Sequence, residues 1–325
     1  MKKQQIKAIM ILYVHIHAIH KKERKYMSFT SLEMSIAAMI PALLLAAYVF
    51  FNDKVEKEPV GLVALLLALG GAVYFPAHGL ENFMIGIADK LFADQAIRSI
   101  EGVIGYQTPL ATLGHGLLVV FVAVALVEEV AKWLITYFVT RNNKNFNCLF
   151  DGIVYATFVS LGFGMVENVS FAFVSGWDTL LLRSLYSVPV HLFSGIVMGY
   201  CYTMWRVYKT ACKAEQEYSK AGLIEIRKPF STKKWFFLMI FLPVIVHGVQ
   251  GFGNVINLGS FSFAFYIFNA AIFLICLAGV RKIASKDTFR GRYADKLLDK
   301  KYPEISGVCD DVENISKAID EWEGE

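Results

Sequence analysis

Seven long apolar windows interrupt this chain of 325 residues, and they restrict its fold more than any other feature. Each is at least as long as the roughly 20 residues that an α-helix needs to cross a bilayer. The windows run over residues 31–51, 59–80, 109–139, 152–175, 181–206, 235–257 and 260–281. At 56% hydrophobic and 18% charged residues, the chain is also too apolar for an ordinary soluble domain. We therefore predict an all-α fold, a polytopic membrane bundle of about seven transmembrane helices.

Residues 82–107, between the second and third windows, have a different pattern. Apolar side chains recur there at helical spacing beside charged residues such as Asp89, Lys90 and Arg98. That combination is typical of a helix lying in the membrane–water interface. We predict an interfacial amphipathic helix over this segment.

The basic residues predict the orientation of the chain. Loop 206–234 carries eight Lys and Arg residues, and the region from Arg281 onward carries nine. By the positive-inside rule both lie in the cytoplasm, which places the C-terminus inside and the N-terminus outside. The basic run at 21–25 opposes that placement of the N-terminus. Either residues 8–20 dip into the membrane or lie on it, or translation begins at Met27, the explanation that we favour.

The same count of spans places the connections at 52–58 and 140–150 inside, and the connection at 176–183 outside. The windows divide the chain into an N-terminal extension, a transmembrane domain and a charged cytoplasmic tail. With translation beginning at Met27, the part of the extension before that residue is not native. We expect these parts at residues 1–30, 31–281 and 282–325.

Charge and cysteine usage exclude two other classes of protein. The net charge is only +4, and the basic residues lie at the ends of apolar runs rather than in one patch, so no nucleic-acid partner is expected. The five cysteines lack the spacing of a metal site or a disulfide framework.

Ionisable side chains inside the windows are the candidate functional residues. Each costs at least about 2.5–3.5 kcal/mol at the centre of a membrane helix, so its presence needs a reason. At about 1.5 Å per residue, the glutamates and histidines of four windows fall at similar depth, which permits one shared site. The residues are Glu128, Glu129 and Lys132 in the third window, Glu167 and Asn168 in the fourth, His191 in the fifth and His247 in the sixth.

A buried ion-pair network around Lys132 is the structural alternative. Lys132 lies three and four residues after Glu129 and Glu128, so one glutamate can pair with it while the other faces the site. Three carboxylates against one lysine nevertheless leave an excess of acid that packing does not explain. Glu81 lies near the end of its window, and we expect it to reach interfacial water.

Four motifs in order resemble the PrsW family of intramembrane proteases, which is related to the CAAX-processing and bacteriocin-immunity protease group. The resemblance covers about residues 31–281, and the loop at 52–59 looks like the family's first loop. It implies a protease that cuts membrane-anchored proteins in a bacterial plasma membrane, with the first cleavage of an anti-sigma factor in envelope-stress signalling as the best-known role. The motifs are EEVAKW at 128–133, DGIVYATFVSLGFGMVEN at 151–168, PVHLFSGIVMGY at 189–200 and FLPVIVHGVQGF at 241–252.

The resemblance also implies roles for single residues. Glu128 and Glu129 match the two glutamates of the EExxK motif, and Glu167 matches the glutamate of FxxxE. His247 matches the essential histidine of the last motif, while His191 matches a family histidine that we regard as supporting.

One departure from the family pattern concerns the last motif. Family members usually carry an aspartate four residues after the histidine, and this chain has Gly251 there. Asn254, one turn further on the same face, can supply the missing polar group. With Lys132 and Asn168, it completes the set of supporting residues.

Amide hydrolysis needs an activated water, a stabilised oxyanion and a proton donor for the leaving amine. We expect Glu128 or Glu129 to act as general base and His247 to polarise the carbonyl oxygen. Glu167, His191 and His247 are the candidate ligands of a metal, with zinc as the candidate ion. No HExxH is present, so a metal-free glutamate mechanism stays equally open.

Two other functions compete with the protease. The same polar residues suit a proton- or cation-coupled transporter, although the chain shows no internal repeat and no pair of broken helices. A catalytically inactive family member that binds membrane proteins is the other possibility, motivated by Gly251. For the protease, the expected partners are single-pass membrane proteins such as an anti-sigma factor, and the lipid bilayer.

Overall fold

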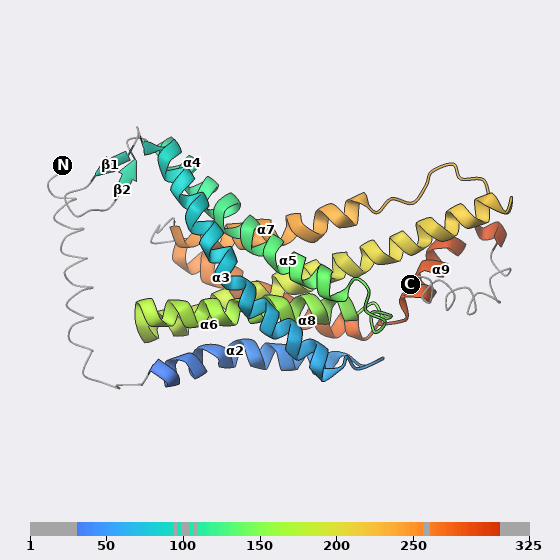
Figure 1. The fold of residues 1–325 in the computed structure, drawn as a ribbon, viewed down its shortest axis with the longest axis horizontal. Coiled ribbons are helices and arrows are strands. Elements are labelled where there is room, and N and C mark those ends of the chain that lie inside the picture. Colours follow the sequence, from blue (N-terminus) through green and yellow to red (C-terminus); the bar gives the residue numbers. More distant parts are fainter. Residues whose placement is uncertain (1–30, 94–95, 99–103, 107–108, 256–260, 306–325) are drawn as a thin grey trace.

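A computed structural model describes residues 31–93, 96–98, 104–106, 109–255 and 261–305, and nearly all of them are helical. The helices are α2 (Ser31–Asn52), α3 (Val60–Leu91), α4 (Pro109–Leu117), the π-helix η2 (Leu118–Leu126), α5 (Val127–Thr140), α6 (Asp151–Lys220), α7 (Lys233–Val255), α8 (Phe261–Ala284), α9 (Arg290–Lys301) and the 3₁₀ turn η3 (Pro303–Ile305). Two short strands, β1 (Ala96–Arg98) and β2 (Ile104–Tyr106), pair antiparallel. Figure 1 shows the long helices gathered into one elongated bundle.

Within these residues, five helices are long and apolar enough to cross a membrane: α2, α3, α6, α7 and α8. The predicted all-α membrane bundle is therefore confirmed. The count of seven spans stays a prediction. Two of the expected windows, 152–175 and 181–206, lie within α6, and the window 109–139 is divided among α4, η2 and α5.

Helix α6 is a hairpin of two arms rather than one rod. Its 70 residues would measure about 105 Å if straight, more than three times the hydrocarbon core of a bilayer. Gly176, at φ 80° and ψ −168°, breaks the helical backbone, and the chain turns back there (Figure 1). Such a positive φ suits glycine, which has no Cβ to clash. The first arm (151–175) and the second arm (177–220) therefore run antiparallel.

Small residues let the two arms of α6 approach closely. A Cβ added at Gly195 would lie 2.6 Å from Cα of Thr157, and one added at Gly199 would collide with the backbone of Gly152. Both contacts are closer than real Cβ atoms make, so only glycine fits without moving the opposite arm. This agrees with the use of small residues at membrane helix interfaces.

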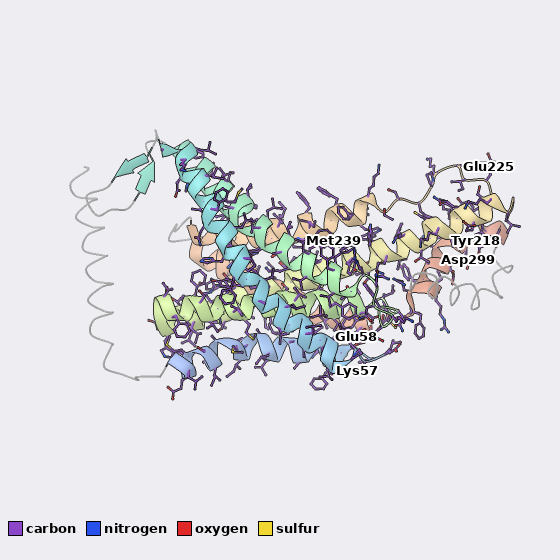
Figure 2. All side chains as sticks on the ribbon, in the orientation of Figure 1. Lys57, Glu58, Tyr218, Glu225, Met239 and Asp299 are labelled. Atoms are coloured by element: carbon purple, nitrogen blue, oxygen red, sulfur yellow. The ribbon has the colours of Figure 1, made fainter. Side chains whose placement is uncertain are left out.

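The first arm of α6 is the centre of the bundle. Residues 151–165 are all buried, with α2, α3, α7 and α8 packed around the hairpin. An arm covered on every side can be mostly apolar, and the few polar side chains on this one, such as Thr157 and Ser160, are buried with the rest. Side chains from all these helices fill the space between the ribbons, and Met239 of α7 lies in the middle of them (Figure 2).

One end of the bundle holds the connections α2–α3, α5–α6 and α8–α9 together (Figure 1). We call it the basic end, because the Lys- and Arg-rich segments 206–234 and 281–301 lie on this side. Leu149 N–H donates to the Thr288 carbonyl at 3.0 Å, and Arg290 N–H donates to the Asn147 carbonyl at 2.7 Å. The Asn147 side chain donates to Glu56 at 2.8 Å. The segments predicted to share the cytoplasmic side are thus joined by hydrogen bonds, and the compartment that they face stays a prediction.

Helix α9 lies in the predicted tail and packs against the C-terminal end of α6. Glu215, which is 1% exposed, pairs with Lys301 and accepts a hydrogen bond from the Tyr302 hydroxyl at 2.6 Å. It also accepts one from the Phe230 N–H at 3.0 Å, which ties the α6–α7 connection to the same point. Part of the charged tail is therefore structured.

The structure corrects the predicted interfacial helix over 82–107. Helix α3 continues without a break to Leu91, and the strands β1 and β2 follow in the same segment. Only Glu81 separates residue 82 from the preceding window, and α3 passes through Pro76 and Gly79 without a break, so periodicity cannot distinguish a new helix from the continuation of the old one. The helical spacing of residues 82–91 belongs to α3.

Candidate active site

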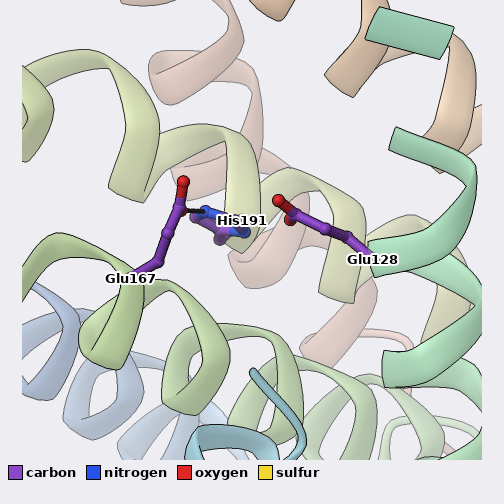
Figure 3. A group of neighbouring side chains, drawn as sticks. All are labelled: Glu128, Glu167 and His191. Carbon is purple, nitrogen blue, oxygen red and sulfur yellow. Dashed lines mark hydrogen bonds and ion pairs between the residues drawn. The ribbon is translucent and has the colours of Figure 1, made fainter. Parts of the chain in front are cut away.

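The ionisable side chains of the apolar windows meet inside the bundle. Helix α5 contributes its first-turn glutamates and a lysine, the two arms of α6 contribute a glutamate and a histidine, and α7 contributes a histidine. All are buried, with exposed fractions of 3% for Glu128, 0% for Glu129 and Lys132, 8% for Glu167, 1% for His191 and 8% for His247. Figure 3 shows Glu128 of α5 close to Glu167 and His191, which come from the first and second arms of α6.

Lys132 links α5 to the second arm of α6. Its ammonium donates to Glu129 Oε1 at 2.9 Å and to Glu128 Oε2 at 3.2 Å, because helix geometry places both carboxylates one turn before it. Nζ also lies 3.1 Å from His191 Nδ1 and 4.5 Å from the ring centroid of Phe163. The sequence predicted pairing with one glutamate, and the structure shows contact with both.

His247 closes the site from α7. Its Nδ1 lies 2.9 Å from Glu129 Oε1 and 3.7 Å from Glu128 Oε2. Its ring centroid is 5.5 Å from that of His191. The second oxygen of Glu129, Oε2, is buried and has no hydrogen-bond partner among the described residues. Glu129 is therefore held firmly on one oxygen only.

Glu167 is held by two partners from the second arm of α6. His191 Nε2 lies 2.8 Å from Glu167 Oε2, and Arg183 Nη2 lies 2.6 Å from Glu167 Oε1. Arg183 is 8% exposed, donates to Ser187 at 3.0 Å and stacks 3.9 Å from the ring centroid of Phe171. The hairpin at Gly176 makes this pairing possible by bringing residue 183 back beside residue 167.

Arg183 is the site residue that the sequence reasoning missed. It stands at the end of the segment 176–183, which was predicted as an outer connection. A signal was present, because Arg183 lies eight residues before His191, about two helical turns, and so on the same face. With Arg183, two fixed cations face the three carboxylates of Glu128, Glu129 and Glu167, which reduces the excess of acid.

Two further predicted placements are corrected. Glu81 was expected to reach interfacial water, but it is 6% exposed, and His78 Nδ1 lies 3.2 Å from it. Asn168 does not join the cluster: its Nδ2 donates to the Ala38 carbonyl of α2 at 3.1 Å. Neighbouring residues point about 100° apart on a helix, so Asn168 faces α2 when Glu167 faces the site.

The structure describes the side chains of the last motif, residues 241–252, but not those of the residues that directly follow it. The side chain of Asn254 therefore lies outside the described part. Gly251 packs against η2, since a Cβ there would lie 3.0 Å from Cγ1 of Val120. An aspartate at this position would have to displace that valine.

The π-helix η2 precedes the two glutamates directly. It ends at Leu126, and α5 begins at Val127. π-Helices are rare and often occur at functional sites, because their wider turn changes the direction of the residues that follow. Gly248, next to His247, lies against the ring of Phe121, so η2 also supports the part of α7 that carries the histidine.

The donor atoms of the site fit a metal of the zinc type. Glu128, Glu167 and His191 offer ligand atoms within 4.8 Å of one another, and so do Glu128, Glu129 and His247. Imidazole nitrogen and carboxylate oxygen are both zinc ligands. The predicted set of Glu167, His191 and His247 is not one of these two groups, and Glu128 belongs to both. Lys132 lies beside each group and would share their carboxylates with a bound cation.

Comparison with known proteins assigns the chain to a family. A model described as "PrsW family intramembrane metalloprotease" matches residues 58–278, which include every helix that contributes to the site. Protease PrsW of Oceanobacillus iheyensis is 29% identical over 216 residues, 66% of this chain and 80% of that protein. Protease PrsW of Bacillus subtilis is 25% identical over 217 residues, 66% and 80% of the two chains. Protease PrsW of Shouchella clausii is 26% identical over 243 residues, 74% and 90% of the two chains.

No solved structure matches this chain. The family model covers more than half of the sequence, and all three relatives carry the same name. The resemblance drawn from the four motifs is therefore confirmed, and with it a peptidase embedded in the membrane. The chain belongs to the PrsW family of intramembrane metalloproteases.

Proposed function

We propose that this chain hydrolyses peptide bonds of membrane-anchored proteins at the cluster of Glu128, Glu129, Glu167, His191 and His247. One observation carries the proposal: the five side chains come from α5, α6 and α7 and meet in the apolar interior, with distances of 2.8 Å from His191 to Glu167, 2.9 Å from His247 to Glu129 and 3.7 Å from His247 to Glu128. Burying so many charges is costly unless they act together. A network that served packing alone would also leave no reason for the Glu129 oxygen that lacks a partner among the described residues.

Glu128 is our candidate general base. Glu129 is held at 2.9 Å by both Lys132 and His247, whereas Glu128 is held more loosely, at 3.2 and 3.7 Å. A loosely held carboxylate can turn toward a water, take its proton and later give that proton to the leaving amine. Glu129 then keeps Lys132 and His247 in position.

His247 is the candidate group for the carbonyl oxygen of the substrate. Its Nδ1 faces Glu129, so when the ring carries a proton on both nitrogens the Nε2–H can donate to the developing oxyanion. His191 contacts Lys132 through Nδ1 and Glu167 through Nε2, and Arg183 orients Glu167 through its ion pair. Lys132 and Arg183 thus act as positioning residues.

Zinc is the metal that these donors suit best, held by Glu128 with Glu167 and His191, or by Glu128 with Glu129 and His247. A bound zinc ion would supply a Lewis acid and lower the pKa of a coordinated water. The metal-free glutamate mechanism is the alternative, and in that mechanism Glu128 is free to act as the base.

The substrates that we propose are single-pass membrane proteins. The motif resemblance favours the first cleavage of an anti-sigma factor, and hence a role in the stress response. It also favours the bacterial plasma membrane, with the basic end and the C-terminus in the cytoplasm and the N-terminus outside. The domain limits at 31–281 and 282–325 belong to the same proposal.

Co-expression with single-pass substrates tests the function. Glu128→Gln, Glu129→Gln and His247→Ala should each lower cleavage by at least about 100-fold, because a positioned acid or base contributes roughly 10²–10⁴-fold. Glu217→Gln is the matched control, since Glu217 is 68% exposed at the basic end. Unchanged cleavage in all three site variants would contradict the proposal, and ion flux through proteoliposomes that is lost in the same variants would support a transporter instead.

A further inference from the structure

A cavity lies at the basic end, between α5 and the second arm of α6. It measures about 420 Å³, within the range of small-ligand sites, and is lined by Tyr137, Arg141, Asn142, Trp205, Arg206, Lys209 and Lys213. Four of these seven residues are cationic and none is acidic. Tyr137 lies about two helical turns beyond Glu129, and Arg206 about four turns beyond His191, so this cavity is separate from the candidate active site.

The cations of this cavity are arranged on backbone carbonyls and aromatic rings. Arg206, 8% exposed, donates to the Arg141 carbonyl at 2.7 Å and lies 4.5 Å from the ring centroid of Phe146. Lys209 lies 5.6 Å from the ring centroid of Trp205, and the Arg141 guanidinium lies 5.8 Å from that of Tyr137. Aromatic faces hold a cation in place without cancelling its charge. The lining of the cavity therefore presents cations and aromatic rings and no carboxylate.

The position of the cavity indicates which anion it meets. Tyr137 and Trp205 stand where the apolar windows end, the level at which aromatic residues mark the membrane–water interface. On α5, Leu134 and Phe138 are 38% and 59% exposed and lead along the helix to Arg141. Leu134, Phe138 and Arg141 are spaced to share one face of α5. A ligand at this place meets positive charge at one end and an apolar strip at the other.

We propose that this cavity binds the phosphate of an anionic phospholipid headgroup, with the acyl chains along Leu134 and Phe138. Basic cavities between membrane helices at the cytoplasmic face recognise such headgroups. A soluble phosphate would use the same cations but would gain nothing from the apolar strip. The proposal goes beyond the protease activity and does not depend on it.

Lipid binding to the purified full-length chain tests the proposal. Native mass spectrometry gives the Kd for dioleoyl phosphatidylglycerol, with dioleoyl phosphatidylcholine and inorganic phosphate as comparison ligands. The double variant Lys209→Gln/Lys213→Gln should bind phosphatidylglycerol about 30-fold more weakly, because each lysine near a membrane surface contributes about fivefold. Both lysines are exposed, so folding is expected to persist, and Arg141→Gln, also exposed, provides a second variant.

Lys233→Gln/Lys234→Gln is the matched control, because it removes the same charge from exposed lysines at the start of α7. The proposal expects the control to bind phosphatidylglycerol like the wild type, and phosphatidylcholine and phosphate to bind much more weakly. Equal weakening in both double variants would overturn it, as would wild-type affinity in the Lys209/Lys213 and Arg141 variants. Phosphate binding as tight as phosphatidylglycerol binding would identify a soluble anion as the ligand and would also overturn it.

Discussion

Lys132 is the residue on which the candidate site is arranged. Its ammonium contacts Glu128, Glu129 and His191 at 2.9–3.2 Å with no exposed surface. The motif spacing placed both glutamates within reach of Lys132 and predicted pairing with one of them, because helix geometry alone brings residues three and four positions apart together. The contact with His191 joins residues 59 positions apart and depends on how α5 packs against α6. No local pattern reports such a contact.

Arg183 is expected to matter for stability and activity in different ways. Arg183→Gln leaves Glu167 as a buried carboxylate without its cation, which should cost about 3–5 kcal/mol of stability and most of the activity. Adding Glu167→Gln should restore much of the stability, because no buried charge is then unpaired, while activity stays lost. Thermal unfolding and substrate cleavage measure the two effects. Wild-type stability of the Arg183→Gln variant would show that the ion pair contributes nothing.

Chelation and substitution of a candidate ligand test whether the site binds a metal. Exhaustive chelation of the purified chain should abolish cleavage, and zinc should restore it, if the carboxylate and imidazole donors hold the ion. Glu128→Gln should lower the bound zinc measured by elemental analysis, because Glu128 belongs to both donor groups. The exposed Glu217→Gln variant should bind zinc like the wild type. Cleavage that survives chelation would favour the glutamate mechanism.

The hairpin of α6 is the element that builds the site. The two apolar windows 152–175 and 181–206 predicted its arms, and the structure joins them through Gly176 into one element. The windows could not predict that Arg183 pairs with Glu167, because that contact depends on how tightly the turn closes and on the register of the two arms. The prediction of an interfacial helix over 82–107 was wrong for a related reason, because helical spacing does not show where one helix ends.

Gly195 is expected to control the spacing of the two arms. Gly195→Ala places a Cβ where only 2.6 Å separates it from Cα of Thr157, so the arms must move apart, one turn from His191. We expect a loss of about 1–3 kcal/mol in stability, as for other overpacked interiors, together with reduced cleavage. Gly79→Ala in α3 is the matched control, because its Cβ would meet nothing within 4 Å. Equal melting temperatures for the two variants would refute the close contact.

The whole molecule carries a pH-sensitive junction at the basic end. Burial and the nearby Asp151 raise the pKa of Glu58 from 4.5 to about 8, and burial raises the pKa of Asp53 from 3.8 to about 6. At a pH between the ordinary and the raised pKa of each group, the folded chain holds a proton on that carboxyl group which the unfolded chain has released. The contribution of each group to stability is therefore complete at low pH and is lost as the pH rises through its folded pKa, about 6 for Asp53 and about 8 for Glu58.

Thermal unfolding across this range tests the junction. The melting temperature should fall between about pH 5 and pH 8, and Glu58→Gln should flatten this dependence because it removes the titrating group. Glu225→Gln, at a carboxylate that is 84% exposed in the α6–α7 connection, should leave the slope unchanged. A Glu58→Gln variant with the wild-type slope would exclude Glu58 as the source.

The amino-acid sequence alone establishes the class of fold, the candidate residues and the family. Long apolar windows allow only membrane helices, because a backbone in lipid must satisfy its own hydrogen bonds. Charges that are costly in those windows mark Glu128, Glu129, Glu167, His191 and His247 as candidates without reference to any contact between helices.

Three features of the site follow from the packing of the helices instead. Arg183 joins the cluster, Asn168 faces α2, and Glu128 is shared by both groups of candidate metal ligands. Each depends on contacts between residues far apart in the chain. The spacing and register of neighbouring helices set such contacts, and neither is encoded in the local pattern of any single helix.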